Sequence, residues 1–218
     1  MAAINGIDTV IFDLDGTLLD TIADLAASTN HALGQMGYPV RTTDEIRRFV
    51  GNGNRMLIKR AAPEGISEDD YERTFQLFCD HYMLHCAEQT VPYEGIQELL
   101  DGLARRGYKM GIVSNKLQAG VSELAARFFG RHISVAIGEG PDTRRKPAPD
   151  CVIRAMELLG TTPQRALYVG DSEVDLQTAA NAGTRIVSVS WGFRSRDQLL
   201  ALNPAYLIDR PEELLGLI

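Results

Sequence analysis

The sequence contains few cysteines and no long apolar run. Its three cysteines, Cys79, Cys86 and Cys151, show no C-x-x-C spacing, which favours reduced thiols in a cytosolic protein. No apolar stretch approaches the roughly 18 residues that a membrane-spanning helix needs. The first residues, Met-Ala-Ala-Ile-Asn-Gly, also lack the basic start and long apolar stretch of a secretory signal. We therefore expect a cytoplasmic location and no membrane partner.

Positive charge is also scarce. The chain has 22 lysine and arginine residues against 29 aspartate and glutamate residues, which gives a net charge of −7. This balance argues against nonspecific nucleic-acid binding, which depends on basic surface. An anionic substrate must therefore be met by local positive groups. The length of 218 residues, with 44% hydrophobic residues, suits a soluble globular protein with one large domain or a core and a smaller insert.

The sequence does contain a strand that leads into two carboxylates. Val10, Ile11 and Phe12 form an apolar run directly before Asp13 and Asp15, and a Gly-Thr turn follows. Such a run predicts a strand buried in a parallel sheet, and these sheets bind ligands beyond the carboxyl ends of their strands. The two carboxylates lie on one side of an extended chain and repel each other unless a cation such as Mg²⁺ intervenes. The alternative is a polar strand end followed by a helix cap.

Hydrophobic periodicity divides the chain into two parts. From Asp20 to Ala87 the pattern is helical without a convincing strand, which predicts a helical insert after the first strand. From Val91 onward, short apolar runs alternate with helical segments, the pattern of a parallel sheet with helices on both faces. We therefore predict an α/β fold with a Rossmann-like core over residues 1–18 and 88–218, and a helical cap over residues 19–87. The later strands are predicted at residues 108–113, 133–137, 166–169, 186–189 and 206–208, and the core helices at residues 94–106, 118–129, 149–159 and 173–182.

Three more polar clusters follow or adjoin predicted strands. Ser114 and Asn115 end an apolar run, where a hydroxyl and helix-start amides make either an anion site or an ordinary N-cap. Lys146 lies in a basic run before a helix that begins at proline. This lysine is either a cation held in a fixed position or part of a solvated surface. Asp171 ends another run, and Asp175 follows one helical turn later. Because parallel strands bring such ends to one edge, the clusters together favour phosphoryl transfer to an aspartate.

Four motifs in order make the sequence resemble a known family. They are D-L-D-G-T at residues 13–17, S-N-K at 114–116, K-P at 146–147 and G-D-S-x-x-D at 170–175. This order is similar to that of the haloacid dehalogenase superfamily, and the match covers nearly the whole chain. The helical insert resembles the small cap of the phosphoglycolate phosphatase-like branch. Two further segments, at residues 50–53 and 92–95, resemble that branch as well.

The resemblance implies a covalent mechanism. Asp13 would attack phosphorus and form an aspartyl-phosphate, while Asp15 would protonate the leaving oxygen and then deprotonate the hydrolytic water. Ser114 and the amide of Asn115 would hold the phosphoryl oxygens, and Lys146 would neutralise charge beside Asp13. A dehalogenase of this superfamily needs no acid two residues after the nucleophile, so Asp15 favours a phosphatase or a phosphomutase.

The resemblance also implies a Mg²⁺ cofactor. Its expected ligands are Asp13, the backbone carbonyl of Asp15, and Asp171. Asp175 and Thr17 are expected to lie behind these groups, with Asp175 orienting Lys146 or a metal-bound water.

In the cap, a Gly-flanked loop is the best candidate for recognising the substrate. Asn52, Asn54 and Arg55 lie there at a helix start, which suits an anion, although a plain loop with a surface arginine is an equal alternative. The segment Trp191-Gly192-Phe193 is expected to pack at the domain edge. The four histidines are interpreted as structural because we see no ligand spacing among them: His31, His81, His85 and His132.

We therefore predict a Mg²⁺-dependent phosphatase of a small phosphorylated metabolite, with phosphoglycolate as the first guess. The alternatives are a phosphomutase of the β-phosphoglucomutase type, a pyrophosphatase of the same superfamily, or a non-catalytic regulatory binder. The expected partner is the small phosphorylated metabolite, without nucleic acid or membrane, and the chain is expected to be a monomer or a homodimer.

Overall fold

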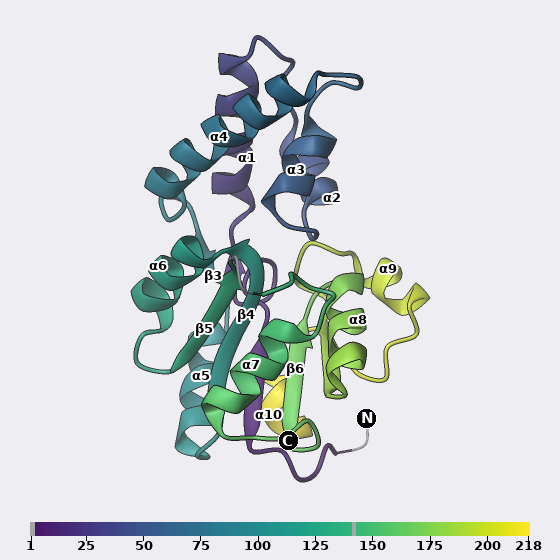
Figure 1. Ribbon diagram of the computed structural model, residues 1–218. Coiled ribbons are helices and arrows are strands. Elements are labelled where there is room, and N and C mark those ends of the chain that lie inside the picture. The colour runs from purple at the N-terminus through teal and green to yellow at the C-terminus, as the bar shows by residue number, and fades with distance from the viewer. Residues whose placement is uncertain (1–2, 141–142) are drawn as a thin grey trace. The chain divides into compact units, whose positions relative to one another are not determined.

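The computed structural model describes residues 3–140 and 143–218, and Figure 1 shows its ribbon. The chain divides into two compact units. The sheet unit comprises Met1–Leu19 and Pro92–Ile218, and the helical unit comprises Asp20–Val91. The helical unit is therefore an insertion into the sheet unit, directly after the first strand and its turn.

Six parallel strands form the centre of the sheet unit, in the order β5-β4-β1-β6-β7-β8. The first strand, β1 (Thr9–Phe12), lies between β4 and β6, and all its residues are buried. Its continuous apolar run is thus explained by cover on both faces. The predicted α/β fold with a parallel sheet is confirmed. The other strands are β4 (Lys109–Leu117), β5 (Val135–Glu139), β6 (Ala166–Gly170), β7 (Arg185–Val189) and β8 (Leu207–Ile208).

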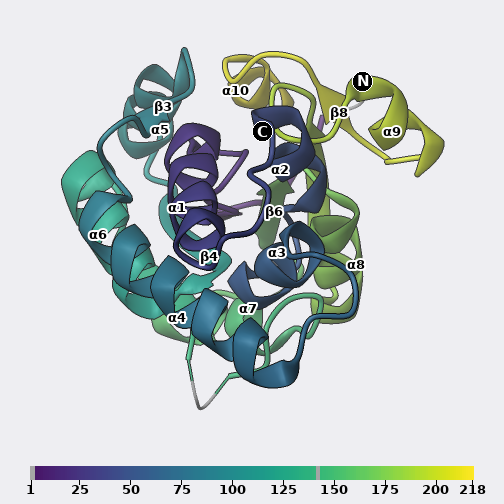
Figure 2. The same ribbon diagram turned by 90° about the horizontal axis from the view of Figure 1, so that it is seen from above.

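Helices cover both faces of this sheet. In Figure 1, α7 and α8 lie in front of the strands while α5 and α10 lie behind them, and Figure 2 shows the same layers from above. Each long helix buries an apolar stripe; in α5 this stripe is Ile96, Leu99, Leu100 and Leu103. The short α9 has no counterpart among the predicted helices. The helices are α5 (Ile96–Arg105), α6 (Gln118–Phe129), α7 (Asp150–Leu159), α8 (Glu173–Ala182), α9 (Arg196–Ala201) and α10 (Glu213–Leu217).

The strand β4 differs from the prediction. We expect a strand over residues 108–113, but β4 continues through Ser114 and Asn115 to Leu117, and its pairing with β5 shifts in register between Val113 and Leu117. The helix α6 begins only at Gln118, and its N-cap residue makes no side-chain capping hydrogen bond. The N-cap interpretation of Ser114 and Asn115 is therefore wrong, because both side chains are buried at the end of a strand and bond other groups there.

The helical unit consists of α1 (Ile22–Gln35), α2 (Thr43–Phe49), α3 (Asn54–Ala61) and α4 (Glu68–His85), with α1 packed along α4. Thr42 is the N-cap of α2 and forms a capping box with Glu45. Two short strands, β2 (Leu19–Asp20) and β3 (Val91–Pro92), pair where the chain leaves and rejoins the sheet unit. Neither is predicted, because two residues are too few to show a pattern. Among the described residues, no helix has both the length and the apolar character needed to span a membrane.

A buried carboxylate fastens the two ends of the helical unit. Asp24, in the first turn of α1, accepts hydrogen bonds from the backbone N–H groups of Gln89 and Thr90 and from the Thr90 hydroxyl, at 2.8–3.1 Å. These partners follow α4 and are 65 and 66 residues away in sequence. Since buried N–H groups need acceptors, one side chain fixes the return of the chain.

Replacing this carboxylate should loosen the helical unit. We expect Asp24→Ala to lower the free energy of opening of α1 by about 1.5–3 kcal/mol, because hydrogen bonds to a charged group are lost and buried N–H groups stay unpaired. Amide hydrogen exchange of α1 measures this quantity. The control is Asp80→Ala, an exposed aspartate bonded to Gln76 within α4, whose effect should stay within about 0.5 kcal/mol. Equal effects of the two variants would contradict the role of Asp24.

Candidate active site

Asp13 and Asp15 follow β1 at the carboxyl edge of the sheet. Asp13 is buried, and its Oδ1 accepts a hydrogen bond from the Leu14 backbone N–H at 2.7 Å. The chain then turns at Gly16, whose φ of 87° lies in the left-handed region that favours glycine. A Cβ at this position would also lie 2.5 Å from Oδ2 of Asp171. The turn after β1 therefore needs glycine and holds the end of β6 close to the end of β1.

Lys146 is a buried cation at this edge. Its Nζ lies 2.8 Å from Oδ1 of Asp13, 2.8 Å from Oδ1 of Asp175 and 3.1 Å from the Tyr168 hydroxyl. The side chain of Asn115 holds the Lys146 backbone from both sides. Its Oδ1 accepts from the Lys146 N–H at 2.7 Å, and its Nδ2 donates to the Lys146 carbonyl at 3.0 Å. The end of β4 thus positions a lysine from a loop 31 residues later.

Asp175 has both carboxylate oxygens engaged. Oδ1 accepts from Lys146 and from the Tyr168 hydroxyl, while Oδ2 accepts from the backbone N–H and the hydroxyl of Ser172. The bond from the Ser172 N–H, together with one from the Asp175 N–H to the Ser172 hydroxyl, forms the capping box that begins α8. The carboxylate is fully buried, so its contacts fix the position of Lys146 relative to the sheet.

Asp171 lies between the turn after β1 and the segment after β7. Its Oδ2 accepts from the Phe193 backbone N–H at 2.7 Å, and the Thr17 hydroxyl lies 3.4 Å from its Oδ1. Gly192 packs against it so closely that a Cβ there would lie 2.5 Å from the Asp171 side chain and 2.2 Å from the Gly16 carbonyl oxygen. Two segments distant in sequence therefore enclose this carboxylate.

Three buried carboxylates lie close to one buried lysine, Lys146, so negative charge is in excess among these groups. Carboxylate oxygens of Asp13, Asp171 and Asp175 lie within 4.8 Å of one another. Burial raises the pKa of Asp13 well above its usual range, although Lys146 opposes the shift. Burial and the charge of Asp175 raise the pKa of Asp171 to about 7. For Lys146, burial acts against the charged form, but Asp13 and Asp175 outweigh it and raise its pKa. A hard dication would relieve this excess of negative charge, so the donor set fits Mg²⁺.

A second buried ion pair joins β4 to the turn after β1. Nζ of Lys116 lies 2.8 Å from Oδ1 of Asp15, and the lysine side chain is 1% exposed. The hydroxyl of Ser114 accepts from the Lys116 backbone N–H at 3.2 Å. Lys116 belongs to the S-N-K motif at residues 114–116, where no role is predicted for it. A lysine directly after an apolar strand is a signal that could have marked it as buried and paired.

Two aromatic positions near the site were also missed. The Tyr168 hydroxyl contacts both Lys146 and Asp175, although the residue lies in an apolar strand. The segment Trp191-Gly192-Phe193 does more than pack: Nε1 of Trp191 donates to the Thr17 carbonyl at 3.0 Å, and Phe193 donates to Asp171. A glycine between two aromatic residues after a strand is the sequence signal that could have marked this segment as part of the site.

The predicted substrate loop lies in the helical unit, where its side chains have structural contacts. Oδ1 of Asn52 accepts from Arg60. Arg55 forms two hydrogen bonds with Glu72, at 2.5 and 3.1 Å, and lies over the Phe75 ring. Asn54 begins α3 and is buried, and its Nδ2 has no hydrogen-bond partner among the described residues. Substrate recognition by this loop stays a prediction.

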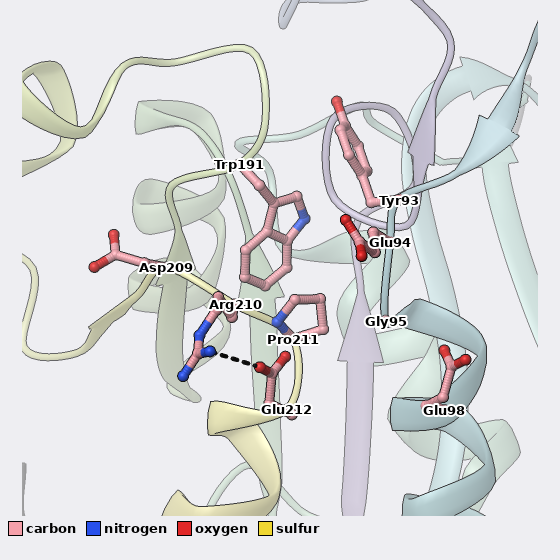
Figure 3. A pocket seen from close by; sticks show the side chains of 9 residues that line it. All are labelled: Tyr93, Glu94, Gly95, Glu98, Trp191, Asp209, Arg210, Pro211 and Glu212. Carbon is pink, nitrogen blue, oxygen red and sulfur yellow. Dashed lines mark ion pairs between the residues drawn. The ribbon is translucent and has the colours of Figure 1, made fainter.

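A separate cavity of about 590 Å³ opens in the sheet unit beside the turn after β1 (Figure 3). Trp191, which forms one wall, is the residue that bonds the Thr17 carbonyl. Arg210 in the lining is paired with Glu212 at 3.3 Å. The other charged lining residues are acids, so the cavity would repel a phosphate group. The residues lining it are Tyr93, Glu94, Gly95, Glu98, Trp191, Asp209, Arg210, Pro211 and Glu212.

The chain is similar to known hydrolases. A family model for haloacid dehalogenase-like hydrolases matches residues 10–189. A phosphoglycolate phosphatase of Mesorhizobium japonicum is 37% identical over 191 residues, covering 86% of this chain and 84% of that protein. An N-acetylmuramic acid 6-phosphate phosphatase of Pseudomonas aeruginosa is 32% identical, covering 96% and 93%. The crystal structure of a candidate phosphoglycolate phosphatase from Lactobacillus delbrueckii subsp. bulgaricus superposes with a TM-score of 0.91 at 33% identity, covering 97% and 98%.

The electrostatics of Asp171 predict a pH-dependent effect on stability. Its pKa is raised from 3.8 to about 7 in the folded, metal-free protein. The folded state therefore favours the protonated carboxyl. The resulting contribution to stability is complete below pH 3.8 and is lost as the pH rises through about 7. Asp171→Asn removes the ionisation and keeps an acceptor for the Phe193 N–H. Above about pH 8 without metal, we expect this variant to unfold with a free energy higher by on the order of 1–4 kcal/mol.

Urea denaturation with and without Mg²⁺ checks this expectation. Saturating Mg²⁺ should stabilise the wild type and not the variant, which reverses their order. Asp101→Asn is the control, and its effect on the free energy of unfolding should have the opposite sign, because the hydrogen bond from His132 lowers the pKa of Asp101. It should lose stability at neutral pH and leave the Mg²⁺ effect unchanged. A metal effect that survives in Asp171→Asn would exclude Asp171 as a ligand.

Proposed function

Because the chain belongs to the haloacid dehalogenase-like hydrolase family, we propose that it is a Mg²⁺-dependent phosphatase of a small phosphorylated metabolite, with phosphoglycolate the first substrate to test. The observation that carries the proposal is the buried pair of Asp13 and Lys146 at the carboxyl edge of the sheet, with the acid Asp171 beside it. A dehalogenase would have no use for Asp15, whereas phosphoryl transfer needs an acid at the leaving group.

Asp13 is proposed as the nucleophile. One of its carboxylate oxygens forms a bond to phosphorus as the bond from phosphorus to the leaving oxygen breaks, which gives an aspartyl-phosphate. Its Oδ1 is held by the Leu14 N–H and by Lys146, which fixes the orientation of the carboxylate for this attack. Lys146 keeps its charge in the buried site and offsets negative charge that develops on the phosphoryl oxygens.

Asp15 is proposed as the general acid and base. It gives a proton to the leaving oxygen and then takes one from the water that hydrolyses the aspartyl-phosphate, so its protonation state is restored. Its side chain is 15% exposed, in contrast to the more deeply buried Asp13, and Lys116 holds it at 2.8 Å. This pairing supports a defined position for Asp15 next to the reacting group.

Asp13, the Asp15 carbonyl and Asp171 would hold Mg²⁺, which supplies electrostatic stabilisation of the phosphoryl oxygens when it is bound. Ser114 lies at the same sheet edge and is proposed to donate its hydroxyl to the phosphate. For Asn115, only the backbone N–H is proposed as a donor, since its side chain is used by the Lys146 backbone.

The relative from P. aeruginosa supports a second substrate class, a sugar-acid phosphate, because the match covers nearly the whole of both chains. The test is release of inorganic phosphate with Mg²⁺ from phosphoglycolate and from N-acetylmuramic acid 6-phosphate, compared by kcat/KM. A phosphatase releases phosphate from at least one small metabolite. Transfer of phosphate between positions of a sugar, with none released to water, would instead establish a phosphomutase.

Asp13→Asn tests the covalent step. The amide has nearly the same shape but is a poor nucleophile, so kcat should fall by roughly a thousandfold or more while the fold is kept. Far-UV circular dichroism checks the fold. Asp101→Asn, at a half-buried position on α5, serves as the matched control and should keep kcat within about twofold. Residual activity of Asp13→Asn near that of the control would refute the aspartyl-phosphate intermediate.

A further inference from the structure

The helical unit carries three histidines in a column. His81 of α4 stacks on His31 of α1, with ring centroids 4.1 Å apart and an interplanar angle of 26°. His81 also stacks on His85, at 4.2 Å and 28°. All four histidines are expected to be structural, but His81 and His85 are four residues apart on one helix and therefore share a face. The histidine column (His31, His81 and His85) is outside the set of residues proposed for phosphoryl transfer.

Hydrogen bonds at one ring nitrogen leave the other nitrogen of each α4 histidine as the ligand atom. Nδ1 of His85 lies 2.6 Å from Oε1 of Glu88. An ionised carboxylate can only accept, so Nδ1 carries the proton and Nε2 keeps its lone pair when the ring is neutral. Nδ1 of His81 lies 3.0 Å from the hydroxyl of Ser28, a buried residue of α1. Metal-binding histidines use this arrangement, in which a partner at one nitrogen orients the ring for coordination through the other.

The column is accessible and its central ring favours the neutral form. His31 is exposed, and His81 and His85 are half-buried. Burial, followed by the neighbouring His31 and His85, lowers the pKa of His81. Metals bind the neutral imidazole, so protons compete less at this ring than at an ordinary histidine.

We propose that His81 and His85 form a binding site for a borderline transition-metal dication such as Ni²⁺, Zn²⁺ or Cu²⁺. Imidazole nitrogens select these metals, whereas Mg²⁺ selects oxygen ligands. The two ring centroids lie 4.2 Å apart, so the imidazoles are near enough to share one ion, for which two metal–nitrogen bonds of about 2.1 Å allow the ligand nitrogens to be up to about 4.2 Å apart. Coordination requires a change of χ2 in the two rings, a torsion that is broad for histidine, and it exchanges part of their stacking for metal–nitrogen bonds.

The site is a two-imidazole chelate. Among the described residues, three such donors do not already converge on one point in the column, so water completes the coordination. His31 contacts His81 and stabilises its ring by stacking. The protein would then carry two cation sites of different chemistry, with oxygen donors in the sheet unit and nitrogen donors in the helical unit. Coordination joins successive turns at the end of α4 and should stabilise that end.

Calorimetric titration of Ni²⁺ into the protein tests the proposal, with saturating Mg²⁺ present to occupy the carboxylate site. We expect one Ni²⁺ per chain. His85→Ala should weaken binding by about tenfold or more, and Glu88→Gln by up to about tenfold through loss of ring orientation. His132→Gln is the matched control, because it removes the imidazole of the sheet unit and leaves the column intact; its affinity should equal that of the wild type.

Thermal unfolding gives an independent measurement. Ni²⁺ should raise the Tm of the wild type and of His132→Gln, and not that of His85→Ala. Circular dichroism and retained phosphate release show whether His85→Ala is folded; if it is not, His81→Gln, which keeps a polar side chain toward Ser28, takes its place. The proposal is overturned if Ni²⁺ does not bind, if it binds the column variants as tightly as the wild type, or if Mg²⁺ displaces it.

Discussion

The compensation of buried negative charge by Lys146 is the interaction on which the sheet edge depends. Three carboxylates of this edge lie within 4.8 Å of one another, and Lys146 contacts two of them at 2.8 Å. Buried charges are tolerated only when they are paired and hydrogen-bonded. The positions of Asp13 and Asp175 are therefore tied to that of the lysine. An excess of negative charge remains even so, and this excess is what makes the edge a favourable place for a dication.

The pairing explains why segments remote in sequence have defined positions. Asn115 at the end of β4 clamps the lysine backbone, and the capping box of α8 holds Asp175. The segment after β7 holds Asp171 through a backbone N–H. Each contact satisfies a buried polar group, so the hydrogen bonds that complete the fold also orient the groups proposed for catalysis. The electrostatic requirement of the site and the packing of the sheet unit are thus met by the same residues.

The helical unit has polar contacts of its own. Asp24 accepts the N–H groups where the chain returns from α4, and Arg55 and Glu72 join α3 to α4. These bonds connect residues within the unit. The stability of this unit therefore arises from contacts within it. The histidine column also gives the unit nitrogen donors, whereas the acidic edge of the sheet unit offers oxygen donors.

The sequence by itself determined the α/β class, the buried strand β1 and the acids that follow it, because apolar periodicity and turn residues act over short distances. The family followed from the resemblance of four motifs in order. Asp13, Asp171, Asp175 and Lys146 belong to these motifs, and the structure brings their side chains together. Only the tertiary structure decided that β4 continues to Leu117, that the Asn115 side chain holds a loop, that Lys116 pairs with Asp15, and that three histidines stack. The Asp171 contact to Thr17 spans 154 positions. Such pairings are set by burial and by the satisfaction of polar groups across the folded chain, and no local pattern encodes them.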